Sequence, residues 1–319
     1  MENYKQSLHL KTNITNSRMS FSPFSFLCEE SIEEEECRDP AISIVMPAYN
    51  AEEFINEAID SIVNQSFTNF ECIIVDDGST DATREIVRSY DDKHIVLLEN
   101  KHNFIDSLNM GMNAASGKYI ARMDADDVMH PDRLLIQYTI METEPSITVC
   151  STWMKRFGDN ISVGNMANSL SGWIEYPLLA FLKGNFVFHP TAMIRKFFLI
   201  ENKLNYQESY LYAEDLKLWM EIAKNGGGFY VENQPLLYYR ISESQVTRRY
   251  KEEQKTTAEN VMHEILLSLI IQNANKYPEL KSTFYELLKL QENKLITFSA
   301  LLDFFQNLFI NNKNKLYLA

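Results

Sequence analysis

Short runs of β-branched and apolar residues alternate with stretches of helical spacing across residues 41–130, and this alternation constrains the fold most. The runs fall at residues 42–46, 71–75, 95–98 and 119–123. The stretches between them repeat apolar side chains every three or four positions, at residues 52–65, 81–90 and 105–115. Strands that alternate with helices across short loops predict an α/β fold, with a doubly wound, mostly parallel sheet flanked by helices.

The rest of the chain mixes both kinds of element. We expect helices at residues 133–142 and 214–224, and strands at residues 148–157, 186–194, 229–231 and 236–241. From about residue 251 the pattern is helical, with an apolar stripe at Leu295, Phe298, Leu301, Leu302, Phe305, Leu308 and Phe309. The sequence therefore predicts a domain over residues 41–250 and a helical C-terminal extension over residues 251–319.

Residues 1–40 differ in composition from everything that follows. They are rich in Ser, Asn and Thr and lead into the acidic run Glu29-Glu30-Ser31-Ile32-Glu33-Glu34-Glu35-Glu36. Acidic blocks of this kind are usually solvated and poorly ordered. We expect an acidic, disordered tail without a catalytic role.

Three carboxylates, Asp124, Asp126 and Asp127, stand in four positions where the strand at residues 119–123 should end. A helix start attracts one or two acids, but Pro131 places the next helix later. Crowded negative charge is unfavourable unless a cation shares the space. Ligands that offer only oxygen suit Mg2+ or Mn2+ rather than zinc. We therefore expect a metal site at the carboxyl edge of the sheet, where open α/β proteins bind ligands.

Composition narrows the classes of function. The formal net charge of −14 argues against a nucleic-acid partner, because phosphate backbones need a basic surface. The four cysteines lack CxxC pairs and metal-ligand spacing, as is typical of reduced cytosolic thiols. No apolar run approaches the ~18–20 residues of a membrane-spanning helix, and no signal peptide is evident. We expect a cytoplasmic protein, free or peripheral on the inner face of the cell membrane.

Two polar groups at strand ends have both a functional and an ordinary interpretation. Tyr49 follows the first strand, where it can stack on a flat heterocycle such as a base or simply occupy a turn. Asp76 and Asp77 end the second strand, where one can accept the imide N–H of a uracil-like base. Helix capping explains the polar residues that follow this pair, but not why two carboxylates end a strand.

Glu214 and Asp215 open the helix expected at residues 214–224. Helix capping is the ordinary interpretation of such a pair. A carboxylate held here can also deprotonate a hydroxyl, because a general base needs hydrogen-bond reach more than a large pKa shift. His189 lies in the segment His189-Pro190-Thr191, and a lone histidine more often has a structural than a catalytic role.

The order of these pieces along the chain resembles the family 2 glycosyltransferases of bacterial surface-polysaccharide type, nucleotide-sugar-dependent enzymes with a GT-A fold. The similarity covers roughly residues 41–245. The matching segments are Ser43-Ile44-Val45-Met46-Pro47-Ala48-Tyr49-Asn50, Val75-Asp76-Asp77-Gly78-Ser79-Thr80-Asp81, Leu108-Asn109-Met110-Gly111, the run from Gly117 to Asp127 with Pro131-Asp132-Arg133-Leu134, His189-Pro190-Thr191, and Glu214-Asp215 with Trp219.

The resemblance implies a division of the domain into a nucleotide-binding half, residues 41–130, and an acceptor-binding half, residues 131–250. In the first half, Tyr49 would stack on the base, and Pro47 and Ala48 would offer backbone contacts. Asp77 would accept a hydrogen bond from the uracil, with Asp76 beside it.

The resemblance also implies roles at the reaction centre. Asp124 would face the ribose and the metal, and Asp126 would ligate the Mn2+ or Mg2+ that bridges the diphosphate, as in a DXD motif. Asp215 would be the catalytic base, supported by Glu214. His189 matches a recurring position near the reaction centre and would contact the nucleotide sugar.

The implied activity is inverting transfer of one hexose from a nucleotide sugar, such as UDP-Gal, UDP-Glc or UDP-GlcNAc, to a hydroxyl of a glycan or lipid-linked acceptor. Biosynthesis of lipopolysaccharide or capsule would use such an enzyme. The chain has Tyr238-Tyr239-Arg240 instead of the Gln-x-x-Arg-Trp motif of processive synthases, which favours single addition. One departure is Asn103-Phe104-Ile105, where many relatives have a glycine soon after the asparagine, so diphosphate contacts from this loop lack support.

Two other functions are compatible with a nucleotide-binding α/β sheet. A sugar-nucleotidyltransferase would favour a Gly-rich, basic loop after the first strand, and Pro47-Ala48-Tyr49-Asn50 is neither. A non-catalytic protein would have no reason to keep Asp124, Asp126 and Asp215. The C-terminal apolar stripe is expected to pack on the domain or on the partner in a homodimer. A membrane-surface role is less favoured, because only Lys294, Lys313 and Lys315 flank the stripe.

Overall fold

A mixed β-sheet runs through the residues that the computed structural model describes, which are 39–158, 164–166, 170–241 and 250–316. The spatial order of its strands is β3-β2-β1-β4-β9-β6-β10-β5, with β7 beside β6 and β8 beside β10. The strands are β1 (Ile42–Ala48), β2 (Phe70–Asp76), β3 (Ile95–Glu99), β4 (Tyr119–Arg122), β5 (Val128–Met129), β6 (Ile147–Phe157), β7 (Gly164–Met166), β8 (Gly172–Trp173), β9 (Met193–Arg195) and β10 (Gly228–Arg240).

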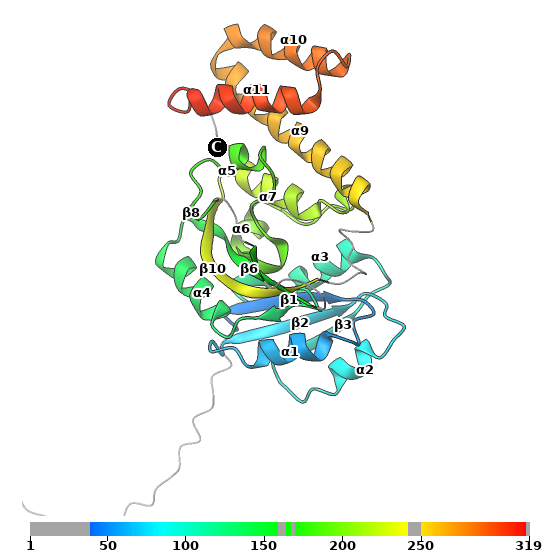
Figure 1. Ribbon diagram of the computed structural model, residues 1–319. Coiled ribbons are helices and arrows are strands. Elements are labelled where there is room, and N and C mark those ends of the chain that lie inside the picture. Colours follow the sequence, from blue (N-terminus) through cyan, green and yellow to red (C-terminus); the bar gives the residue numbers. More distant parts are fainter. Residues whose placement is uncertain (1–38, 159–163, 167–169, 242–249, 317–319) are drawn as a thin grey trace, which may run out of the picture. The chain divides into compact units, whose positions relative to one another are not determined.

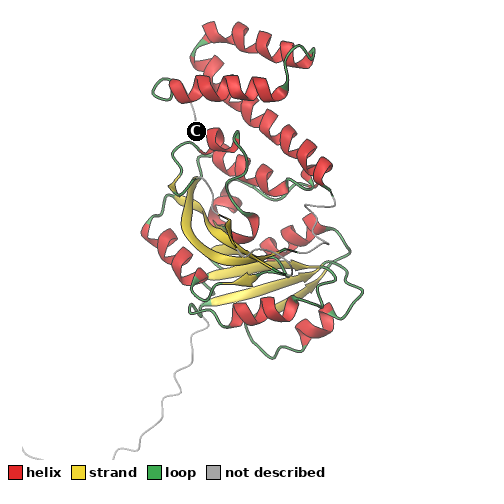
Figure 2. Ribbon diagram, viewed as in Figure 1, coloured by secondary structure: helices red, strands yellow, loops and turns green. Residues whose placement is uncertain are grey.

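Helices cover both faces of this sheet (Figure 2). Those of the domain are α1 (Ile55–Val63), α2 (Thr83–Arg88), α3 (Phe104–Ala114), α4 (Arg133–Thr143), α5 (Pro177–Phe181), α6 (Lys196–Glu201) and α7 (Glu214–Lys224). The described residues also form 3-10 turns at His189–Thr191, Glu208–Tyr210 and Pro278–Leu280. The C-terminal helices are α9 (Lys251–Lys276), α10 (Lys281–Glu292) and α11 (Phe298–Asn311).

Alternation of side chains along β1 explains the two layers of helices. Ile44 and Met46 point into the cluster that contains the buried residues of α1 and α4. Val45 points the other way, into the cluster shared by α3, α5, α7 and α9. Figure 1 shows α1 and α3 on opposite sides of the sheet. The predicted α/β class and doubly wound sheet are confirmed.

The parallel strands bring the predicted site residues to one edge of the sheet. β1 pairs in parallel with β2 and with β4, and Ala48 at the end of β1 stands opposite Asp76 at the end of β2. Gly117, in the turn before β4, lies so close to β1 that a Cβ there would meet the Ser43 backbone nitrogen at 2.6 Å. The loops that follow these three strands therefore begin side by side.

Two predictions of strands were wrong. Residues 186–194 do not form one strand, because His189–Thr191 is a 3-10 turn and only Met193–Arg195 pairs with the sheet. The two closing strands expected at residues 229–231 and 236–241 are one strand, β10, whose register with β6 shifts between Glu232 and Pro235. Pro235 has no N–H to donate to the ladder, and the register shifts on both sides of it while the pairing with β6 continues.

The C-terminal helices join the core of the domain through α9, which contacts α5 and α7. On α11, Leu301, Phe305 and Phe309 are buried in the same cluster, whereas Leu295, which precedes the helix, is 70% exposed. Among the described helices, none combines the length and apolarity needed to cross a bilayer. The tail predicted at residues 1–40 lies outside the described residues except for Asp39 and Pro40.

Candidate active site

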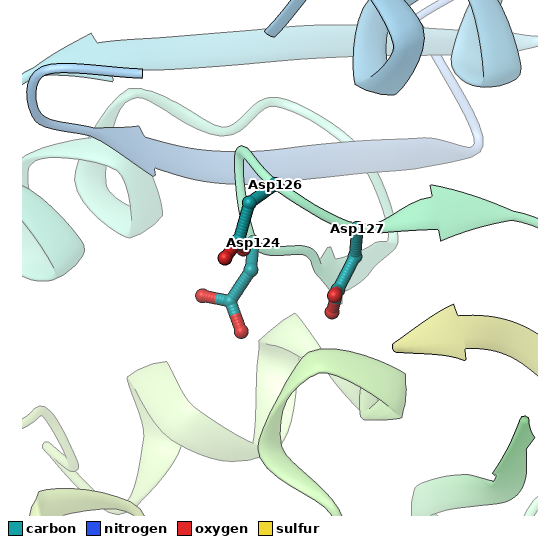
Figure 3. Close-up of side chains that lie close together, drawn as sticks. All are labelled: Asp124, Asp126 and Asp127. Atoms are coloured by element: carbon teal, nitrogen blue, oxygen red, sulfur yellow. The ribbon is translucent and has the colours of Figure 1, made fainter. Parts of the chain in front are cut away.

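The acidic loop between β4 and β5 carries three carboxylates close together. One oxygen from each of Asp124, Asp126 and Asp127 lies within 4.8 Å of the others. Figure 3 shows the three side chains projecting from this single loop. Asp124 and Asp126 are half-buried, whereas Asp127 is fully buried. Asp124 and Asp126 are therefore accessible to an incoming group, and Asp127 lies buried beside them.

A buried arginine from the last position of β4 lies against this loop. Arg122 is 3% exposed and pairs with Asp124. Its backbone carbonyl accepts a hydrogen bond from Arg133 Nη2 (2.9 Å), and Arg133 Nε donates to Gln137 Oε1 (3.0 Å). Although burial opposes the charge of Arg122, the carboxylate of Asp124 holds its pKa above the usual value. A fixed positive charge therefore stands at the carboxyl edge of the sheet.

Burial and mutual repulsion change how the acids of the loop ionise. Burial, followed by the negative charge of Asp124, raises the pKa of Asp126 to about 6. The same causes, together with the charge of Asp126, raise the pKa of Asp127 well above its usual range. Each acid thus makes ionisation of its neighbours less favourable.

A second pair of acids opens α7. Asp215 is half-buried; its Oδ1 accepts the N–H of Leu216 (2.7 Å), and its Oδ2 accepts from Asn185 Nδ2 (2.8 Å). Burial raises the pKa of Asp215, whereas these hydrogen bonds and the charge of Arg122 oppose the rise. Burial and the charge of Asp215 raise the pKa of Glu214 to about 7, and Glu214 Oε2 has no partner among the described residues.

His189 begins the 3-10 turn before β9 and packs against α7. Its Nε2 is 2.7 Å from the Tyr206 hydroxyl, and its ring meets the Trp219 ring edge to face, with centroids 6.1 Å apart. Burial and the nearby Arg122 lower the pKa of His189 well below its usual value, so its imidazole is neutral near pH 7. The positive charge of Arg122 also opposes the rise that burial causes in the pKa of Asp126, Glu214 and Asp215.

The acids at the end of β2 have different partners. Asp76 is 1% exposed and accepts the N–H of Ser79 (3.2 Å). Asp77 is 3% exposed, and its Oδ1 accepts from the backbone N–H of Asn103 and the hydroxyl of Ser107, both at 2.7 Å. Backbone N–H groups and the Ser107 hydroxyl are therefore the main partners of these carboxylates, and the Arg84 guanidinium lies 3.6 Å from Asp76 Oδ2.

Tyr49 completes this side of the site. Its side chain is 46% exposed and follows Pro47 and Ala48, which are buried in β1. The Asp77 backbone N–H donates to the Ala48 carbonyl (2.7 Å), which ties the β1 and β2 ends together. The described structure thus places Tyr49 and Asp77 on neighbouring loops, beside the acidic loop that follows β4.

Comparison with known proteins identifies the family. The model of the family described as Glycosyl transferase family 2 matches residues 43–202, which include β1, the acidic loop and His189. The chain belongs to glycosyl transferase family 2. The predicted resemblance is therefore confirmed, and family membership favours the glycosyltransferase interpretation over a sugar-nucleotidyltransferase.

Curated relatives of this family 2 glycosyltransferase include two bacterial proteins. An uncharacterized glycosyltransferase of Haemophilus influenzae is 36% identical over 239 residues, which are 70% of this chain and 73% of that protein. A putative teichuronic acid biosynthesis glycosyltransferase, TuaG, of Bacillus subtilis is 30% identical over 227 residues, which are 68% of this chain and 86% of that protein.

Among solved structures, S. aureus TarS 1–349 in complex with UDP-GlcNAc matches with a TM-score of 0.59 and 23% identity. The match covers 72% of this chain and 66% of that chain. In a longer TarS structure, the matched part is 39% of the chain. At this level of identity the likeness shows a shared GT-A-type fold, with a mostly parallel sheet flanked by helices.

The acidic loop of this family 2 glycosyltransferase suits a small divalent cation. Its donors are carboxylate oxygens only, as Mg2+ and Mn2+ prefer. Asp127 Oδ2 is buried and has no hydrogen-bond partner among the described residues. A cation would relieve the repulsion that raises the pKa of Asp126 and Asp127. The residues present therefore fit the predicted metal site.

Several residues of the site received no role from the sequence. Arg240, at the end of β10, donates from its backbone N–H to Asp127 Oδ1 (2.9 Å) and from Nε to the Asp126 carbonyl (2.8 Å). Its guanidinium also pairs with Glu57 and lies 4.3 Å from the ring centre of Phe54. Arg240 thus connects the acidic loop with α1 through contacts to both. Arg122, Arg133, Asn185 and Tyr206 also belong to the site, and the partners of Asn185 and Tyr206 lie 30 and 17 positions away in the sequence.

Proposed function

We propose that this chain is an inverting, metal-dependent glycosyltransferase that moves a single hexose from a nucleotide sugar to a hydroxyl of a glycan or lipid-linked acceptor. UDP-Gal, UDP-Glc and UDP-GlcNAc are the proposed donors. The TarS structure with bound UDP-GlcNAc supports a UDP-sugar. The name of TuaG, in teichuronic acid biosynthesis, supports a role in bacterial surface polysaccharides, which include lipopolysaccharide.

One observation carries the proposal, namely that the segment from His189 to Ala192 contacts both acidic groups. The Ala192 carbonyl accepts the N–H of Arg122 (2.9 Å), which pairs with Asp124, and the His189 ring meets Trp219 on α7, the helix that carries Asp215. Burial raises the pKa of Asp215, and the charge of Arg122 opposes this rise. Asn185 and the Leu216 N–H hold the Asp215 carboxylate in one orientation. A direct displacement needs a base and a bound cation close to the same reacting atoms.

In the proposed reaction, Asp215 removes the proton of the acceptor hydroxyl as its oxygen forms a bond to the anomeric carbon. The bond from that carbon to the diphosphate breaks on the opposite face, so the anomeric configuration inverts. Glu214 supports the base. A Mg2+ or Mn2+ held by Asp126 and Asp124 would supply positive charge for the leaving diphosphate.

We propose that residues 41–130 bind the nucleotide and that residues 131–250 bind the acceptor. Tyr49 stacks on the base, and Pro47 and Ala48 contact it through their backbone. Asp77 accepts the imide N–H, with Asp76 supporting the turn. His189, neutral and hydrogen-bonded to Tyr206, is proposed to contact the donor near the reaction centre.

The test is release of nucleoside diphosphate from a panel of nucleotide sugars, with and without Mn2+. Asp215→Asn should retain donor binding and reduce transfer by about 10^2–10^4-fold, the usual contribution of a general base. Asp303→Asn, on the exposed face of α11, is the matched control and should leave transfer unchanged. Near-normal turnover by Asp215→Asn would remove the base assignment. Consumption of a nucleoside triphosphate would instead indicate a nucleotidyltransferase.

A further inference from the structure

His102, in the loop between β3 and α3, contacts both residues proposed to bind the base. Its ring stacks on the ring of Tyr49, with centroids 4.1 Å apart and planes 28° apart. Its Nδ1 lies 3.2 Å from Asp77 Oδ2 and 3.1 Å from the Asp77 carbonyl. One flat nitrogen heterocycle of the protein therefore makes the stack and the polar contact that the resemblance implies for the bound base.

Asp77 has one carboxylate oxygen left for a base. Its Oδ1 already accepts two hydrogen bonds, from the Asn103 N–H and the Ser107 hydroxyl. Oδ2 is the oxygen that faces His102. A nucleotide that donates its imide N–H to Asp77 must therefore use the oxygen beside the imidazole.

The stacked rings leave no space for a second heterocycle between them. Carbon atoms of two rings in contact lie about 3.5–4.0 Å apart, so a base inserted between two rings needs them about 7 Å apart. The Tyr49 and His102 centroids are 4.1 Å apart. A base on this face of Tyr49 can bind only after His102 moves.

His102 is placed so that its side chain can leave. The side chain is 64% exposed, so nothing large covers it. Its backbone φ is +27°, in the region that only a few per cent of non-glycine residues occupy. Its backbone passes over Gly78, where an added Cβ would meet the His102 nitrogen at 3.1 Å. The backbone of the loop is thus held closely, whereas the imidazole projects outward.

We propose that His102 occupies the base site of the free protein and competes with the nucleotide, so that it sets the affinity for the donor. This inference rests on the proposed function, because it takes Tyr49 and Asp77 as the base-binding residues. When a site is open for only a fraction of the time, the apparent affinity of its ligand falls by that fraction. Removal of the imidazole should therefore strengthen nucleotide binding.

The experiment measures the Kd of UDP by calorimetry in the presence of Mn2+ for the full chain and its variants. His102→Ala should lower the Kd by about three- to tenfold, which corresponds to a base site that is open 10–30% of the time in the free protein. His102→Gly should do the same, and it also accepts the positive φ without strain. His102→Phe keeps a ring on Tyr49 and should show little or no gain.

An unchanged or higher Kd in both His102→Ala and His102→Gly would overturn the inference, because it would mean that the imidazole does not compete or that it contacts the bound nucleotide. Tyr49→Ala and Asp77→Asn separate this result from failure of the proposed function. Tyr49→Ala should raise the Kd of UDP about five- to 150-fold, since stacking on an aromatic ring contributes about 1–3 kcal/mol per base. Asp77→Asn should also raise it, because the acceptor of the imide N–H is lost. If neither does, the base site itself is misassigned.

A second measurement follows the imidazole directly. In protein with isotopically labelled histidine, the His102 ring resonances should move when UDP is added, because the ring loses the shielding of Tyr49. His94, which stacks on Phe70 at 5.0 Å and hydrogen-bonds with Asp92, is the internal control and should not respond. A His102 signal that stays constant at saturating UDP would also overturn the inference.

Discussion

Two groups of acids follow parallel strands of this glycosyltransferase, and their surroundings differ. Asp76 and Asp77, at the end of β2, accept hydrogen bonds from backbone N–H groups and a hydroxyl. Burial raises the pKa values of Asp126 and Asp127, after β4, and the negative charge of Asp124 raises them further. The two groups look alike in the sequence because each is a cluster of carboxylates directly after a buried strand.

The difference follows from what each loop can donate. Neutral donors arranged around a carboxylate stabilise its charge, and they are the main partners of the acids at the end of β2. The loop after β4 has its main donors in Arg122, at the end of β4 itself, and in Arg240, which reaches the loop from β10. A carboxylate cluster thus indicates a cation site only where nearby backbone N–H groups do not satisfy the carboxylate oxygens. Three substitutions test this distinction.

The largest effect is expected at Asp126. Asp126→Asn removes a carboxylate proposed to hold the metal and should reduce transfer by about 10^2–10^3-fold, as the loss of one charge-stabilising group does in other enzymes. The measurement is diphosphate release over a titration of Mn2+. Asp91→Asn, at an exposed position between α2 and β3, should behave as the unsubstituted protein. Activity within a few-fold of normal at every Mn2+ concentration would show that the loop does not hold the metal.

A smaller effect, on folding stability, is expected from the arginines beside the two groups. Arg122→Met leaves the acids after β4 without their buried counter-charge and should lower the free energy of unfolding by about 3 kcal/mol. Arg84→Met is the matched change at the end of β2, where Arg84 Nε is 3.6 Å from Asp76 Oδ2 and the side chain is 34% exposed. Its cost should stay below about 1 kcal/mol. Urea unfolding of both variants measures the contrast, and equal losses would contradict it.

The smallest effect concerns the pH dependence of transfer. Asn185 donates a hydrogen bond to Asp215 and thereby lowers a pKa that burial has raised. Asn185→Ala should leave that pKa higher, so a larger fraction of the base is protonated at a given pH. The acidic limb of the pH profile of kcat/KM should therefore move to higher pH, while the rate on the alkaline side changes little.

The comparison variant for this pH profile is Asn307→Ala, at an exposed position of α11, which should leave the profile in place. A shift of the acidic limb to lower pH would contradict the role assigned to Asn185. An acidic limb that stays in place, together with a normal rate, would also contradict that role.

Much of this architecture could be predicted because its signals are local. The helix at residues 214–224 was predicted at its observed bounds, since Glu214 and Asp215 open an amphipathic repeat. The turn at His189 was mistaken for a strand. Apolar residues around it suggested continuity, but Pro190 lies in a 3-10 turn whose Thr191 hydroxyl donates to the Phe188 carbonyl (2.8 Å). The conformation of that segment therefore depends on its tertiary contacts.

The residues that end the parallel strands could be identified from the sequence, and with them the position of Tyr49, Asp77 and Asp124 at one edge of the sheet. Strand length, side-chain alternation and loop position could be predicted because they depend on residues that are close together in the sequence. The family could be predicted for the same reason, from the order of those segments.

Which distant groups meet depends on how the sheet is assembled. Asp127 and Arg240 are 113 positions apart in the sequence, and Asn185 and Asp215 are 30 apart. The pairing of β10 with β5, which directly follows Asp127, brings Arg240 to the acidic loop. Partners so far apart leave no periodic trace in the sequence, because charge interactions depend on distance in space and on burial. The acids could be found from the sequence, but the partners that lie far from them along the chain could not.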